Sequence, residues 1–312
     1  MGAVLRYSFL LLLILSGCRN YQRVLEKDKS QSDPETGYIT ISGTKLNYVI
    51  EGKGKPCLVI GSSIYYPRTF SKQLRDSLKF YFVDMRWFAK EYNPVKVENY
   101  TLDTILSDIE KVREGLNLDK VIIAGHSIHS VIAFEYARKH PDRVSHIVMI
   151  GSPAWQTNQE QEDAIKNIWQ TASPERKKLQ NENWKKLSEM KGLSPAQFDI
   201  ENYCLMAPKY WYDMTYDARW LWKDMTLNTE ILNSLYDSVF RDYFIFRHER
   251  SVPVPTFVAM GRYDYVDPYT LWEGFDDIKG LTVRIFEKSG HTPQLEESAL
   301  FNGELLQWLS EN

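Results

Sequence analysis

Strand-like and helix-like hydrophobic patterns alternate along the chain from about residue 38 onward. Apolar runs of strand length occur at 38–42, 45–51, 57–60, 80–84, 121–124, 144–150, 254–260 and 281–286. Stretches with helical spacing lie between or after them, at 69–78, 102–116, 128–140 and 296–309. Strands that alternate with helices predict an α/β fold: a mostly parallel, twisted sheet with helices on both faces.

The strand pattern disappears between residues 153 and 251, where helical periodicity and loops take its place. We therefore predict a folded core at 38–152 and 252–312, with a helical cap at 153–251 inserted between two strands. Six of the nine tryptophans fall in this cap, namely Trp155, Trp169, Trp184, Trp211, Trp220 and Trp222. They could simply pack cap against core, but we expect at least three to line a largely apolar substrate pocket. Our candidates for the pocket lining are Tyr65, His129, Trp155, Trp211 and Trp220.

The first residues have the features of a targeting segment. Arg6 precedes an apolar run of seven residues at 9–15, which is too short to span a bilayer because a spanning helix needs roughly 20. The run ends in Leu-Ser-Gly-Cys and resembles the lipobox of bacterial lipoproteins, although an ordinary signal peptide would fit the same pattern. The resemblance implies a signal peptide at 1–17, a lipid anchor on Cys18, and an exported protein held at a membrane of the cell envelope. Residues 18–37 are polar and predict a flexible tether.

Composition narrows the range of partners. The chain carries 38 Lys and Arg against 41 Asp and Glu, a formal charge of −3, so no broad cationic field exists to attract nucleic acid. We find neither a glycine-rich phosphate loop nor a His/Cys cluster with metal spacing, and we expect no cofactor and no metal. Export would permit a disulfide between Cys57 and Cys204, but we expect two buried free cysteines.

A short motif around Ser127 carries the strongest chemical signal. The run Gly-His-Ser-Ile-His at 125–129 directly follows a predicted strand and precedes a predicted helix, which is the context of a nucleophile elbow. At this point the chain resembles the α/β-hydrolase family, and the resemblance extends from about residue 38 to the C-terminus. The family pattern is Gly-x-Ser-x-Gly, so His129 stands where glycine is usual. This implies either an adjusted elbow or an imidazole that reaches into the pocket.

The family resemblance also implies a base and an acid. His291 follows the last predicted strand, where the family carries its base, and Asp264 occupies the acid position of a Gly-x-x-Asp-x-x-x-Pro run at 261–268. Asp267 is the competing acid; its alternative role is to cap the helix expected to begin at Pro268. We expect the side chain of His126 to point away from the site.

The resemblance further implies two backbone donors for an oxyanion. Ile128 should supply one N–H, and the loop after the strand at 57–60 should supply the other, with Ser62 as our candidate.

Together these residues predict a serine hydrolase that cleaves a carboxylic ester or related acyl bond of a small, largely apolar substrate through an acyl-enzyme on Ser127. One alternative is an aminopeptidase resembling prolyl iminopeptidases, in which cap carboxylates would hold a substrate ammonium; Glu201, Asp213, Asp217 and Glu230 are available. A lactonase is another. The altered elbow and oxyanion loop leave open a protein of a different class, a ligand-binding or sensing module that does not catalyse.

Overall fold

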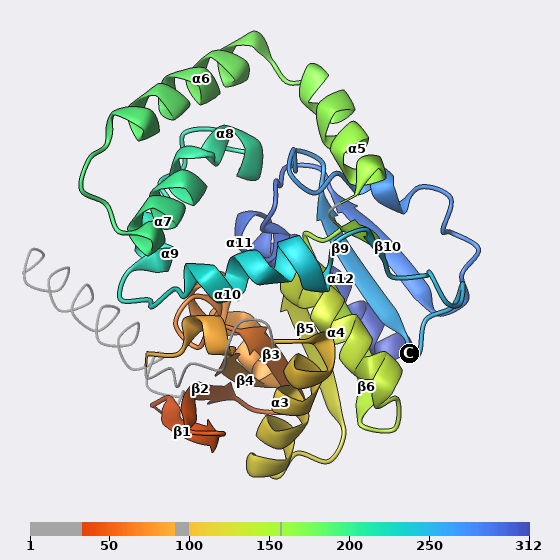
Figure 1. Cartoon of the computed structure of the whole chain (residues 1–312). Coiled ribbons are helices and arrows are strands. Elements are labelled where there is room, and N and C mark those ends of the chain that lie inside the picture. Colours follow the sequence, from red (N-terminus) through yellow and green to blue (C-terminus); the bar gives the residue numbers. More distant parts are fainter. Residues whose placement is uncertain (1–32, 91–99, 157) are drawn as a thin grey trace, which may run out of the picture. The chain divides into compact units, whose positions relative to one another are not determined.

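A central sheet of eight strands organises the fold, which comes from a computed structural model that describes residues 33–90, 100–156 and 158–312. The strands are β1 (Glu35–Ile41), β2 (Thr44–Gly52), β3 (Lys55–Gly61), β4 (Leu78–Asp84), β5 (Val121–His126), β6 (Val144–Ile150), β9 (Thr256–Gly261) and β10 (Leu281–Phe286). Their order across the sheet is β1-β2-β4-β3-β5-β6-β9-β10 (Figure 1). In this order the strands from β4 to β10 pair in parallel, whereas β2 runs antiparallel to β4. The predicted α/β sheet is confirmed.

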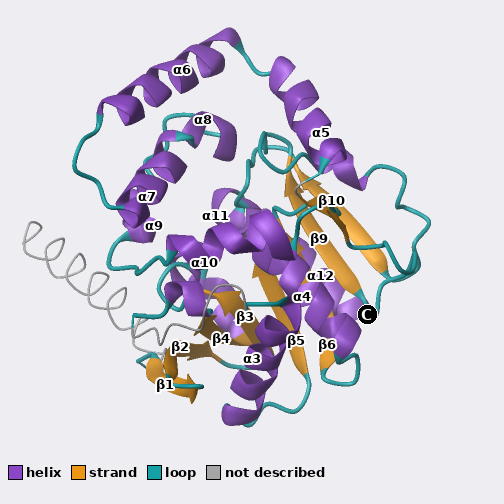
Figure 2. Ribbon diagram, in the orientation of Figure 1, coloured by secondary structure: helices purple, strands orange, loops and turns teal. Residues whose placement is uncertain are grey.

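The centre of the sheet is buried on both faces, since every residue of β5 and six of the seven residues of β6 are buried. Side chains that alternate along β3 enter two different cores: Leu58 and Ile60 join one, and Cys57 and Val59 join the other. Helices α3 (Leu102–Gly115) and α4 (Ile128–Lys139) contribute to the first core, whereas α12 (Ser298–Glu311) contributes to the second. Figure 2 shows these helices flanking the strands. Such a sandwich places the carboxyl ends of the parallel strands at one edge, where loops can carry chemistry.

Helices dominate the segment between β6 and β9. They are α5 (Gln159–Gln170), α6 (Pro174–Glu189), α7 (Pro195–Leu205), α8 (Ala207–Tyr210), α9 (Arg219–Trp222), α10 (Thr229–Ser234) and the π-helical turn η4 (Leu235–Val239). The expectation that this segment lacks strands was wrong, since β7 (Trp155–Gln156) and β8 (Tyr243–Phe244) form a short antiparallel pair. The rings of Trp155 and Phe244 stack there with centroids 3.7 Å apart, which clamps the beginning of the segment to its end.

Two of the predicted helices differ from those in the structure. The amphipathic stretch at 69–78 does not form a regular helix; it contains the end of α2 (Tyr66–Thr69) and a 3-10 helix at Lys72–Asp76. A short 3-10 helix at Tyr269–Trp272 occupies the place of the helix expected from Pro268, and α11 (Pro293–Glu296) precedes the closing helix α12. Both Cys57 and Cys204 are buried and free.

Residues 1–32, with the predicted signal peptide, Cys18 and most of the predicted tether, lie outside the described part of the chain. Within the described part, no helix has both the length and the apolar character to cross a membrane.

Candidate catalytic site

Ser127 lies at the sharp turn between β5 and α4. Its backbone has φ 55° and ψ −133°, a conformation that costs energy for a residue with a Cβ atom. The turn is held because the Ser127 N–H donates to the carbonyl of Ile150 over 2.8 Å. A Cβ atom on Gly125 would lie 2.2 Å from the carbonyl oxygen of His129, so only glycine lets helix and strand approach this closely. The geometry is that of a strained elbow that presents a serine hydroxyl.

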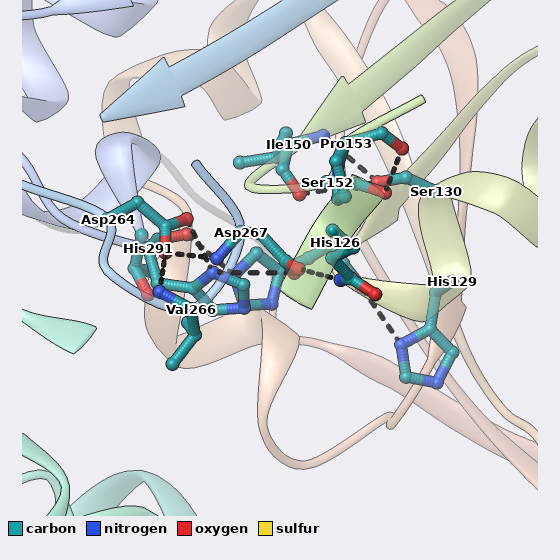
Figure 3. Close-up of polar contacts among 12 residues, drawn as sticks. His126, His129, Ser130, Ile150, Ser152, Pro153, Asp264, Val266, Asp267 and His291 are labelled. Carbon is teal, nitrogen blue, oxygen red and sulfur yellow. Dashed lines mark hydrogen bonds and ion pairs between the residues drawn. The ribbon is translucent and has the colours of Figure 1, made fainter. Parts of the chain in front are cut away.

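His291 and Asp264 form a buried hydrogen-bonded pair in the loops after β10 and β9. The Nδ1 of His291 lies 2.8 Å from Oδ2 of Asp264, while the other Asp264 oxygen accepts from the N–H groups of Val266 and Asp267 (Figure 3). The backbone N–H of His291 donates to the carbonyl of Tyr210 over 2.6 Å. Because Nδ1–H donates to the carboxylate, the lone pair of His291 lies on Nε2. That nitrogen is therefore free to accept a proton.

The surrounding carboxylates set the basicity of His291. Burial alone would lower the pKa of His291, but the charge and hydrogen bond of Asp264, with the charges of Asp267 and Glu296, outweigh burial and raise it above its ordinary value. Burial, with repulsion from Asp264, raises the pKa of Asp267 to about 7 against the opposing effects of His291 and Gln161. Asp267 Oδ2 lies 4.0 Å from His291 Nδ1, so Asp264 is the acid in hydrogen-bond contact.

Glu296 braces the loop that carries His291. Its carboxylate accepts from the backbone N–H groups of Gly290, Thr292 and Tyr212 at 2.7–3.2 Å. Burial raises the pKa of Glu296 to about 7 despite these three bonds. No sequence pattern indicates this role, because the three donors come from two separate segments of the chain.

The expectation for His126 was wrong. Its ring lies against that of His291 with centroids 4.6 Å apart, and its Nε2 donates to the backbone carbonyl of His291 over 2.9 Å. Burial and the neighbouring His291 lower the pKa of His126 well below its ordinary value, so this ring is neutral. His126 thus packs directly on the candidate base and lines the cavity.

His129 explains how a histidine fits in the elbow. Its ring stacks on that of Trp87 with centroids 5.5 Å apart. The Nε1–H of Trp87 donates to Nε2 of His129 over 3.1 Å, and Nδ1 of His129 lies 3.0 Å from Tyr66 Oη and 3.1 Å from the carbonyl of His126. In Figure 3 the His129 ring lies on the far side of His126 from the pair Asp264 and His291.

Ser127 and His291 open into one cavity of about 300 Å³. Its remaining lining is mostly apolar and aromatic, with Phe88, Tyr203, Tyr210, Trp222, Met225, Leu227, Leu232 and Tyr236 among the described residues that form it. Tyr65, His129 and Trp211, three of the five residues proposed for a substrate pocket, line the cavity. Trp155 and Trp220 do not: Trp155 stacks in the β7–β8 pair, and Trp220 is 46% exposed with its indole N–H donated to Tyr216. Only Trp211 and Trp222 of the six cap tryptophans reach the cavity, and tyrosines supply the aromatic surface that we had expected from the others.

Ser62, in the loop after β3, and Ile128, at the start of α4, line the same cavity. Ile128 is the first residue of α4, so its N–H has no carbonyl acceptor within the helix. The hydroxyl oxygen of Ser62 accepts from the N–H groups of Ile64 and Tyr65, which folds the loop after β3 back on itself. Both backbone positions fit the donor roles that the sequence suggested, although these roles remain a prediction. In the part of the chain that the structure covers, no group of three or more His, Cys, Asp or Glu residues is arranged to hold a metal ion.

The sheet, the elbow and the His–Asp pair together define an α/β-hydrolase. The profile of the alpha/beta hydrolase fold family matches residues 59–172. A Bacillus subtilis protein, the AB hydrolase superfamily protein YclE, is 35% identical over 271 residues, which cover 86% of this chain and 96% of that protein. The chain therefore belongs to the α/β-hydrolase family and is a hydrolytic enzyme.

More distant relatives within the family differ in what their names say they act on. A proline iminopeptidase of Saccharolobus solfataricus is 22% identical over 84% of this chain and 88% of its own length. The crystal structure of a Bacillus megaterium epoxide hydrolase superposes on 88% of this chain and all of its own, with a TM-score of 0.63 and 18% identity. At this identity the structural likeness supports the fold alone.

Proposed function

We propose that this α/β-hydrolase is a serine hydrolase that cleaves a carboxylic ester or related acyl bond of a small, largely apolar substrate. The observation that carries the proposal is that Ser127 and His291 open into the same cavity, whose lining is mostly apolar and aromatic, while Asp264 holds Nδ1 of His291 from behind. A hydroxyl on a strained elbow that shares a cavity with a buried imidazole is suited to attack a carbonyl carbon when the imidazole is unprotonated. Asp264 is the acid in this proposal.

The reaction proceeds through an acyl-enzyme. His291 Nε2 takes the proton of Ser127 as the serine oxygen bonds to the carbonyl carbon, and the N–H groups of Ile128 and Ser62 stabilise the resulting oxyanion. Collapse of this intermediate breaks the bond to the alcohol, which leaves with the proton from His291. Water then attacks the acyl-enzyme with His291 as base, and this second step releases the acid and restores Ser127.

The charges of the cap favour an ester over an amino-terminal peptide. None of Glu201, Asp213, Asp217 and Glu230 is among the cavity-lining residues of the described chain. Glu201 and Asp217 pair with Arg219 at 2.7 and 2.9 Å. The carboxyl group that does line the cavity, Asp267, accepts from Gln161 over 2.8 Å and has its pKa raised to about 7 by burial, so it offers a substrate ammonium only part of a charge near neutral pH.

A substrate panel tests this assignment. p-Nitrophenyl esters of increasing acyl length are compared with the p-nitroanilides of proline and alanine, using wild type, Ser127→Ala and, as a matched control, the exposed Ser188→Ala. We expect ester hydrolysis by wild type and Ser188→Ala, and a loss on the order of 10⁴-fold or more in Ser127→Ala. Turnover of the anilides in preference to every ester would support the aminopeptidase instead.

We further propose that the enzyme is exported and membrane-anchored and that its helical segment forms a cap. Residues 1–17 act as a signal peptide, and lipidated Cys18 anchors the exported enzyme to a membrane through the tether at 18–37. Residues 153–251 serve as a cap over the carboxyl edge of the sheet. The supporting observations are the lipobox-like Leu-Ser-Gly-Cys run and the cavity residues Tyr203, Trp211 and Tyr236 from this segment.

A further inference from the structure

The tautomer of His129 follows from its contact with Trp87. An indole nitrogen can only donate, so the 3.1 Å contact from Trp87 Nε1 to His129 Nε2 requires that Nε2 carries no proton. Burial lowers the pKa of His129 to about 4, so the ring is neutral at physiological pH. The single ring proton therefore resides on Nδ1.

This proton determines the direction of the Tyr66 hydroxyl group. Nδ1–H of His129 faces two acceptors, the carbonyl of His126 at 3.1 Å and Tyr66 Oη at 3.0 Å. Tyr66 cannot donate to a nitrogen that already bears a proton, so its oxygen accepts and its own O–H hydrogen points elsewhere. No other hydrogen-bond partner of Tyr66 Oη is found among residues 33–90, 100–156 and 158–312.

The ring of Tyr66 is fixed beside the elbow. It is 3% exposed, begins α2 directly after the oxyanion loop, and meets the rings of His126 and His129 edge to face with centroids 6.0 and 5.8 Å away. A Cβ atom on Gly61 would lie 2.2 Å from this ring, so the glycine at the end of β3 provides the space that it occupies. Tyr66 lines the cavity together with Ser62, Ser127 and Ile128.

We propose that the Tyr66 hydroxyl is a catalytic residue that donates a hydrogen bond to the oxyanion of the tetrahedral intermediate, as a third donor beside the two backbone N–H groups. His129 and Trp87 are positioning residues, because they hold the tyrosine oxygen as an acceptor and so leave its proton for the substrate. This inference rests on the proposed function. A preorganised donor of this kind acts on the transition state more than on the bound substrate.

Tyr66→Phe tests the donor while keeping the ring. We expect kcat for the best ester to fall about 100-fold with KM changed less than about threefold, by analogy with the loss of one oxyanion donor. The affinity for a phenylboronic acid, which forms a tetrahedral adduct with serine, should fall by a similar factor. The control is Tyr81→Phe, a buried tyrosine of β4 outside the cavity lining, which should retain both values. Unchanged kcat and boronate affinity in a folded Tyr66→Phe would overturn the proposal.

Trp87→Phe tests the positioning relay separately. Without the indole N–H, His129 can carry its proton on Nε2 and accept from Tyr66, so kcat should fall while the wild-type hydroxyl is present. On the Tyr66→Phe background the same change should have almost no further effect. An equal loss on both backgrounds would mean that Trp87 acts only through packing, and would refute the relay. If a thermal melt shows that Tyr66→Phe is unfolded, Trp87→Phe is the test: lower kcat and boronate affinity would support the proposal, and unchanged values would overturn it.

The controls separate this inference from the function on which it rests. Ester turnover that is lost in Ser127→Ala but kept in Tyr66→Phe would refute the tyrosine role alone. Absence of ester turnover in wild type would refute the proposed function, and the tyrosine role with it.

Discussion

The histidine in the elbow, His129, should make the fold sensitive to mild acid. Burial lowers the pKa of His129 from 6.5 to about 4 in the folded protein, whereas the unfolded chain keeps the ordinary value. At a pH between these two pKa values, His129 is protonated in the unfolded chain but not in the folded protein. Stability from this residue is therefore fully present above pH 6.5 and is lost as the pH falls toward 4.

The size of this effect follows from the two pKa values of His129. Lowering the pH from 7 to 5 should cost about 2 kcal/mol through this residue alone, and the full loss below pH 4 should approach about 3 kcal/mol. The local structure gives the reason: a proton on Nε2 would place an N–H against the Trp87 N–H that now donates to it. Other buried histidines, including His126, add acid sensitivity of their own, so a comparison of variants is required.

Urea unfolding of the full chain at pH 7 and pH 5 measures this contribution. The free energy of unfolding of wild type should drop by about 2 kcal/mol more than that of His129→Gln over this interval. The exposed His248→Gln serves as control and should follow wild type. Parallel pH dependences of wild type and His129→Gln would refute the burial argument and, with it, the tautomer assigned to His129.

Three further predictions follow from the site and the N-terminus. The kcat/KM of ester hydrolysis should rise with pH with a midpoint above pH 6.5, because the pKa of His291 is raised and only its neutral form is a base. Asp264→Asn should lower both this midpoint and the rate. A midpoint below pH 6.5 in wild type would contradict the prediction. In a urea titration, Gly125→Ala should lower the free energy of unfolding by about 2 kcal/mol or more, since the added Cβ atom would lie 2.2 Å from the His129 backbone. The control Gly303→Ala, which places its Cβ atom in open space on α12, should leave the free energy of unfolding unchanged or raise it. Cys18→Ala should move the protein from the membrane to the soluble fraction after cell lysis, and unchanged fractionation would count against lipidation.

Local patterns predicted much of this molecule. The strands β3, β4, β5, β6 and β9 each contain four consecutive apolar residues, and the elbow combines a strand end, a serine and a helix start within a few residues. Sequence alone therefore located both. The direction of His126 depends on the loop that brings His291 against it from a distant part of the chain. Likewise, helical spacing in the cap could not show whether Trp155 faces the cavity or stacks on Phe244, because that depends on a strand pair formed by residues about 90 positions apart. The part played by Tyr66 depends on Gly61 and on a proton position, neither of which leaves a sequence pattern.

The central claim is that Ser127 is the nucleophile of this α/β-hydrolase. Intact-protein mass spectrometry after incubation with a fluorophosphonate tests it most directly, because the probe forms a stable adduct with a serine activated by a neighbouring base. We predict one adduct on wild type and on Ser188→Ala, and none on Ser127→Ala. A folded wild type that remains unmodified, or a Ser127→Ala variant that is modified at the same rate, would contradict the account and favour a ligand-binding protein or a nucleophile elsewhere.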